Sequence, residues 1–236
     1  MNYLYLLLNL GSISIPFIFS FHPKLRFYKF WKSLLFALVI TMTVFISWDI
    51  IFTQIGIWGF NQDYFLGFQI ANLPIEEWLF FICIPYACVF THYALLKYMP
   101  YLKLSERLAK IIVVLLILTL VTTALIHLDK WYTSINFLFA SALIVLVQFN
   151  NKNLFRTYFW TFLVMLLPFF IVNGILTGSY IESEVVWYNN AETLGIRLAT
   201  IPIEDTVYAF SLILMNLFLN EFFQVLIDKK KHRINS

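Results

Sequence analysis

Charged side chains are scarce in this sequence. Asp, Glu, Lys and Arg together make up 12% of its 236 residues, while 61% of the residues are hydrophobic. Soluble globular domains carry about 25% charged residues, so this composition excludes a soluble domain and indicates lipid surroundings. Residues 1–21 are apolar but have no basic segment and no small-residue cleavage site, so we expect a retained helix.

Motifs for the common cofactors are also missing. The two cysteines, Cys83 and Cys88, lie in one apolar run and offer neither a disulfide framework nor a zinc-ligand spacing. There is no Gly-x-Gly-x-x-Gly fingerprint, no P-loop and no Asp-rich cluster that would hold magnesium diphosphate. We therefore expect no cofactor and no metal, and a substrate that is neutral and dissolved in the membrane.

Seven long apolar runs account for most of the chain. Each is long enough to cross about 30 Å of hydrocarbon as an α-helix, and backbone groups in lipid must be satisfied within their own segment. The sequence therefore predicts an all-α, polytopic membrane helical bundle of about seven transmembrane helices. These helices are expected at residues 3–21, 33–54, 76–97, 110–127, 132–149, 157–178 and 204–227.

The basic residues predict how these helices are oriented. If seven helices cross the membrane, 14 of the 16 Lys and Arg residues fall on one side, and only Lys130 and Arg197 fall on the other. An excess of Lys and Arg marks the cytoplasmic side. We expect a multi-pass protein of a bacterial cell membrane, with its N-terminus outside and its C-terminus in the cytoplasm.

A short motif occurs twice. Residues 66–77 and 194–205 align without gaps and are identical at six of twelve positions, including Pro-Ile-Glu before a second acid. Each motif opens a helix in the same direction, so we expect parallel repeats related by an axis along the membrane normal. The first three-helix repeat is expected at 1–98, a connecting helix at 99–131 and the second repeat at 132–236, all in one membrane unit.

The repeated acids are the candidates for chemistry. Acids in membrane helices are costly and usually face a cavity or the bundle interior. Glu76 and Glu204 are the identical pair, so we expect them to be central, with Glu77 and Asp205 orienting them or capping the helix. Neighbouring carboxyl groups can provide an acid and a base in one pocket. The alternative is a favourable helix start, since Pro in the first turn and acids near an N-terminus suit a helix.

Three polar residues are candidates to support these acids. Asp49 and Asn173 are expected in the same outer half of the bilayer as the motifs. Arg197, seven residues before Glu204, could keep one acid ionised, and its counterpart in the first half is Gln69, so the two halves would differ in charge. The alternative for Arg197 is a surface position in an acidic loop, because ion-pair networks also occur for structural reasons.

Aromatic residues make up 19% of the chain. Most of them are expected to face lipid or to lie in the interface belts. Trp48, Phe80 and Tyr208 lie close to the acids in the sequence, and aromatic rings can stabilise a cation through their faces. We therefore consider these three as substrate-binding residues, although core packing is the simpler explanation for each one taken alone.

The two motifs carry a resemblance to a known family. Pro74-Ile75-Glu76-Glu77 and Pro202-Ile203-Glu204-Asp205, in a membrane protein with two three-helix halves, resemble the fused heterodimeric-type lycopene cyclases, which work without flavin. The Gly195-x-Arg197 and Asn173 positions are similar to the pattern of the second half. The resemblance covers nearly the whole chain, and the first half is the less typical one.

The resemblance implies an isomerase of carotenoid biosynthesis. A carboxylic acid would protonate the end of a linear polyene, lycopene or γ-carotene, and a carboxylate would deprotonate the ring cation to give a β-ionone ring, with no cofactor. Membrane lipids and other carotenoid-biosynthesis enzymes are the implied partners, and nucleic acid is not. Whether one or both ends are cyclised, and whether β- or ε-rings form, stays open.

Other classes of membrane protein share some of these features. A carotenoid hydratase or a prenyltransferase would also act on an isoprenoid, although a prenyltransferase needs the Asp-rich motifs that are missing. A small proton-coupled transporter could use the same acids as a proton relay. A purely structural or binding membrane protein would need no acid pair at all.

The predicted topology can be tested with reporter fusions. Because the basic residues fall on one side only with seven crossings, a fusion after Ser236 should report the cytoplasm and one within 178–200 should report the outside. A phosphatase and a fluorescent reporter, active on opposite sides, provide the measurement. Two fusions on the same side would contradict both the topology and the parallel repeats.

Overall fold

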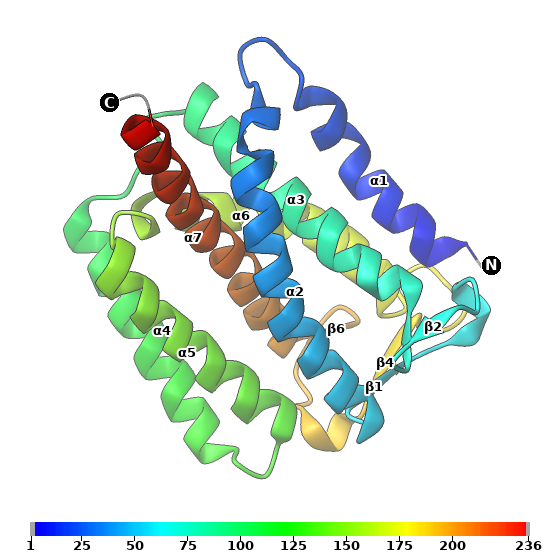
Figure 1. Cartoon of the computed structure of the whole chain (residues 1–236). Helices are drawn as coiled ribbons and strands as arrows, with labels where there is room; N and C mark the ends of the chain where they lie inside the picture. The colour runs from blue at the N-terminus through cyan, green and yellow to red at the C-terminus, as the bar shows by residue number, and fades with distance from the viewer. Residues whose placement is uncertain (1–2, 235–236) are drawn as a thin grey trace.

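The structure, a computed structural model, describes residues 3–234, with side chains through residue 230. Seven α-helices make up most of this part of the chain (Figure 1). They are α1 (Leu4–Phe19), α2 (Trp31–Gln54), α3 (Ile75–Tyr98), α4 (Glu106–Ile126), α5 (Trp131–Asn151), α6 (Phe155–Leu176) and α7 (Ile203–Ile234).

Short strands occupy the two connections that lead into α3 and α7. The first connection holds β1 (Trp58–Phe60), β2 (Gln69–Ile70) and β3 (Leu73–Pro74), and the second holds β4 (Val186–Tyr188), β5 (Arg197–Leu198) and β6 (Ile201–Pro202). Short 3-10 helices lie at Phe27–Phe30, Gln62–Tyr64 and Asn190–Glu192. The strands and the N-terminus lie at one end of the bundle and the C-terminus lies at the other (Figure 1).

The chain is a multi-pass helical membrane protein, as the sequence predicts. Within the described residues, six helices are long and apolar enough to cross a membrane. The first helix is shorter than the expected span 3–21, because it ends at Phe19 and the chain turns at Ser20. With 16 residues, α1 is about 24 Å long at 1.5 Å per residue.

The two connections have the same local fold. β2 pairs with β3 and β5 pairs with β6 as antiparallel hairpins, with Gln69 opposite Pro74 and Arg197 opposite Pro202. The tips of both hairpins hold an alanine in the left-handed region, Ala71 at φ 51° and Ala199 at φ 58°. Each hairpin therefore delivers a proline to the residue before a long helix, which fixes the start of α3 and α7.

One strand pair joins the two halves. β1 and β4 are antiparallel, with Trp58 opposite Tyr188, Gly59 opposite Trp187 and Phe60 opposite Val186. These residues are equivalent under the repeat, so the pair is symmetric about Gly59 and Trp187. The pseudo-two-fold axis passes through this pair, and it places the starts of α3 and α7 on either side of one point.

The packing of the helices follows the same pseudo-two-fold symmetry. α1 packs along α3, and α5 packs in the same way along α7. An asparagine in each outer helix donates to the first turn of its partner: Asn9 to the carbonyl of Glu76 and Asn136 to the carbonyl of Glu204, both at 2.8 Å. α4 stands outside the repeat and packs on α5.

The strand pair at the axis generates a prediction about stability. A Cβ atom at Gly59 would lie 2.4 Å from Cζ2 of Trp187, so Gly59→Ala should lower the free energy of unfolding by about 1–3 kcal/mol, as overpacking does. Thermal unfolding in detergent measures this loss. Adding Trp187→Ala should restore much of it.

The matched control is Gly11→Ala in α1, where a Cβ atom meets nothing within 4 Å. This variant should unfold at or above the temperature of the parent protein, since alanine favours a helix over glycine. Equal unfolding temperatures for Gly59→Ala and Gly11→Ala would contradict the close approach at the axis.

Candidate active site

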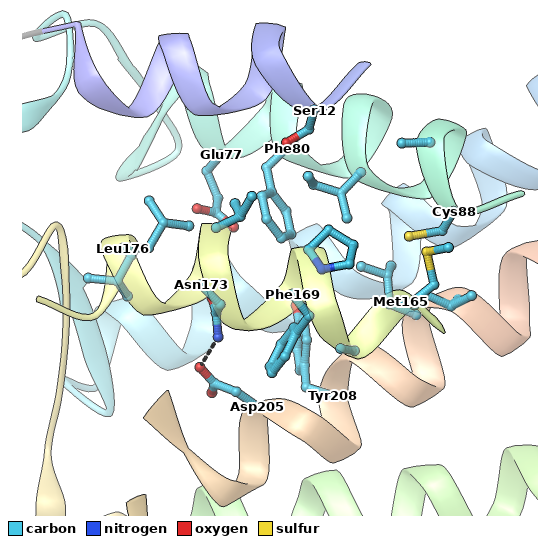
Figure 2. Close-up of a pocket in the computed structure, with 18 of the residues that line it drawn as sticks. Ser12, Glu77, Phe80, Cys88, Met165, Phe169, Asn173, Leu176, Asp205 and Tyr208 are labelled. Atoms are coloured by element: carbon cyan, nitrogen blue, oxygen red, sulfur yellow. Dashed lines mark hydrogen bonds between the residues drawn. The ribbon is translucent and has the colours of Figure 1, made fainter. Parts of the chain in front are cut away.

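A cavity of about 360 Å³ lies between α1, α3, α6 and α7. Most side chains around it are apolar. Its acids gather at the end next to the strands, where Glu77, Asn173 and Asp205 lie, and Cys88 and Met165 lie toward the other end (Figure 2). Apolar walls with a few converging polar groups are typical of small-molecule sites.

The first half contributes a carboxyl pair. Glu77 lies in the first turn of α3, and the hydroxyl of Tyr5 in α1 donates a hydrogen bond to its carboxyl group. Asp49 of α2 lines the same cavity beside the Glu77 side chain. The hydroxyl of Tyr208 in α7 donates to Asp49 at 2.8 Å. Two acids from two helices therefore meet in the cavity, with a tyrosine on each.

The second half contributes one acid with three donors. Asp205, in the first turn of α7, accepts from Tyr132 at 2.6 Å, from Asn173 at 2.8 Å and from Tyr188 at 2.9 Å. Burial and the Asp205 carboxyl raise the pKa of Tyr188 well above its ordinary value, so this hydroxyl keeps its proton and donates it. In the described part of the chain, no three His, Cys, Asp or Glu side chains gather as a metal site requires.

The sequence also matches a known protein family. A sequence model described as lycopene cyclase matches the chain twice, over residues 2–96 and 129–223. The chain belongs to the lycopene cyclase family. The two matched ranges contain the two halves that share the strand pair, one before α4 and one after it. No curated protein and no solved structure shows a significant match to the chain.

The structure places the two acids of each motif in different surroundings. Glu76 and Glu204 do not line the cavity, whereas Glu77 and Asp205 do. Adjacent residues on a helix point about 100° apart, so Glu76 and Glu204 point toward the loop when Glu77 and Asp205 point into the cavity. Each accepts a hydrogen bond from the amide ten residues before it, Leu66 at 2.8 Å and Leu194 at 2.6 Å.

Among the supporting residues, two contact the acids directly and one lies on the hairpin before α7. Asp49 contacts Glu77 and Asn173 contacts Asp205. Arg197 is exposed on the β5–β6 hairpin, where it donates to the carbonyl of Thr200 at 2.6 Å and to Asn190 at 2.9 Å. Its guanidinium carbon also lies 6.0 Å from the centre of the Tyr188 ring, so Arg197 approaches the site only through a neighbour of Asp205, and its expected effect on the charge of an acid stays a prediction.

The aromatic candidates divide in a similar way. Phe80 and Tyr208 line the cavity, together with Trp58 and Phe60 from β1. Trp48 does not line it. Its ring is buried behind Tyr208, with 5.4 Å between the ring centroids. Trp48 thus supports the wall of the cavity, and only Phe80 and Tyr208 of the three expected residues can touch a substrate there.

The sequence interpretation missed the tyrosines that bind the acids. Tyr5 and Tyr132 occupy the same position in α1 and α5, and each stands four residues before the asparagine that anchors the helix pair. The pattern Tyr-x-x-x-Asn therefore occurs once in each half. The repeated pattern is visible in the sequence. The distance along the chain between its two copies is one residue shorter than the distance between the two acid motifs.

The position of Glu76 and Glu204 predicts a structural role. Glu76→Ala should lower the free energy of unfolding by about 1–3 kcal/mol, because the Leu66 amide loses its acceptor. Glu76→Gln keeps an oxygen for this amide and should be close to the parent protein. Thermal unfolding in detergent compares the two, and equal unfolding temperatures would contradict the assigned contact.

Proposed function

We propose that this member of the lycopene cyclase family closes β-ionone rings on the ends of a linear polyene, lycopene or γ-carotene. The reaction is an acid–base isomerisation with a carbocation intermediate, within the membrane and without net redox change. The observation that supports it most is the set of three cavity acids, a carboxyl pair from one half beside a single carboxyl from the other. The apolar walls suit a hydrocarbon substrate.

The pair of Asp49 and Glu77 is proposed as the acid. Like charges in contact cannot both ionise readily, so two neighbouring carboxyl groups hold a proton between them. Glu77 lines the cavity and is the group that delivers this proton. It adds to the terminal double bond of the polyene and leaves a carbocation, which the next double bond attacks to close a six-membered ring.

Asp205 is proposed as the base. Its three donors are neutral groups, and hydrogen bonds donated to a carboxylate favour the ionised form. Asp205 removes a proton from the ring cation, which restores a double bond. One proton enters the substrate and one leaves, so the product is an isomer of the substrate.

The aromatic wall is proposed to protect the cation. Phe80, Tyr208, Trp58 and Phe60 surround the acid end of the cavity, and ring faces attract a positive charge. An apolar enclosure also excludes water, which would otherwise capture the cation as an alcohol. This environment favours a cyclase over a hydratase.

The proposal predicts the effect of removing each acid. Membranes containing the protein should convert lycopene to ring-bearing carotenoids, resolved by HPLC. Glu77→Gln and Asp205→Asn should each lower the rate by about 10²–10⁴-fold, the usual contribution of a general acid or base. Both changes keep the shape of the side chain, so insertion and folding should persist.

The neighbouring acids are the matched controls. Glu76→Gln and Glu204→Gln make the same chemical change one residue away and should retain most of the activity, because these side chains bind the loop and do not line the cavity. Full activity in Glu77→Gln and Asp205→Asn would end the proposed mechanism. An alcohol product from the parent protein would identify a hydratase instead.

A further inference from the structure

The most exposed part of the cavity wall lies on α6. Of the residues that line the cavity, Leu167 is 72% exposed and Val164 is 41% exposed, and both belong to α6. Ser12 and Pro16 of α1 line the same cavity and are half-buried. α1 packs along α3 and makes at most slight contact with α6. The cavity therefore has an exposed rim between α1 and α6, at the level of the membrane.

The repeat offers an internal comparison for this rim. Tyr5 and Asn9 of α1 correspond to Tyr132 and Asn136 of α5, because they make the same bonds. Counting on by three residues, Ser12 corresponds to Phe139. The small residue at the rim of the cavity thus has a large aromatic counterpart in the other half.

At the counterpart position, aromatic rings fill the space. The ring of Phe139 lies 5.5 Å from the ring of Phe45 and 5.5 Å from that of Trp48, both of α2. Tyr208 lies 5.0 Å from Phe45 on the inner side. α2 also packs along most of α7, whereas α6 contacts α3 over a smaller stretch. One of two equivalent gaps is closed by side chains and the other is open.

We propose that the polyene enters the cavity from the lipid through the gap between α1 and α6, which Ser12 keeps open where Phe139 closes its counterpart. This inference rests on the proposed function. A cavity of about 360 Å³ is at the small end of ligand sites, too small for a whole carotenoid. One end of the polyene lies at the acids, and the rest of the chain passes between Ser12 and Val164 into the lipid.

The first test replaces Ser12 of α1 with phenylalanine, the residue at the corresponding position of α5. Ser12→Phe should block the rim and lower kcat/KM for lycopene about tenfold or more, since a small misplacement of a substrate already costs on the order of 10²-fold. Ser14→Phe makes the same change two residues away on an exposed position that does not line the cavity, and it should leave the rate unchanged.

Substitutions on α6 test the other side of the proposed entrance. Val164→Trp should reduce the rate in the same way, while Leu163→Trp should not, because Leu163 is 57% exposed and does not line the cavity. Adjacent residues on a helix point about 100° apart, so the introduced tryptophan side chains point in different directions from nearly the same place on α6. This pair decides the question if Ser12→Phe fails to insert.

A second readout separates entry from chemistry. The amount of lycopene that co-purifies with the protein, and the rate at which it binds, are measured by absorbance in the inactive Glu77→Gln background. Slower binding with Ser12→Phe and Val164→Trp, and parent-like binding with Ser14→Phe and Leu163→Trp, is the expected result. Parent-like binding in all four variants would overturn the proposed entrance. Polyene binding without any cyclisation by the parent protein would overturn the proposed function and leave the entrance standing.

Discussion

A carboxyl group inside an apolar helical bundle must find its hydrogen-bond donors within the protein, and the structure is arranged around this requirement. The two acids of each motif meet it differently. The first, Glu76 or Glu204, accepts from the amide of the loop before the helix, and Glu204 also accepts from Thr133 of α5. The second, Glu77 or Asp205, accepts from a tyrosine of the neighbouring helix. The loops, the helix starts and the outer helices are thereby held together at one end of the bundle, and the cavity forms where the second acids point.

This arrangement of loop, helix start and outer helix occurs once in each half, and the two copies together form one site. The strand pair at the axis brings the two motifs together, and the cavity receives an acid from each. Around them the halves differ. Asp49 contacts Glu77 where Asn173 contacts Asp205, so one half carries two acids and the other an acid with neutral donors. This difference in neighbours is what allows the proposed division into an acid and a base.

The sequence predicts the helical architecture better than it predicts the directions of the side chains in the site. Long apolar runs marked the helices because lipid leaves few alternatives, and the doubled motif marked the acids. Which of two adjacent acids faces the cavity depends on the rotation of a helix, and a gapless motif does not encode it. The hydrogen bonds that tie Asn9 to α3 and Asn136 to α7 are long-range contacts of this kind, and the motif alone does not reveal them. The direction of Arg197 is equally hidden from the sequence, because it depends on the geometry of a two-residue hairpin strand.

The position of the acids at the helix starts also suits the proton balance of the proposed reaction. In that proposed reaction the substrate would gain one proton from the Asp49 and Glu77 pair and return one to Asp205, so no net proton would have to come from water. The acids can therefore lie under the strand pair, where Trp58 and Tyr188 cover them, without loss of turnover. What each cycle does require is an internal return of the proton from Asp205 to the pair. Tyr208 bonds to Asp49, and Tyr188 and Tyr132 bond to Asp205. Under the proposed mechanism, the hydroxyl groups that hold the acids in place would also lie on the way of this proton, which would give the tyrosines a chemical role in a wall that is otherwise apolar.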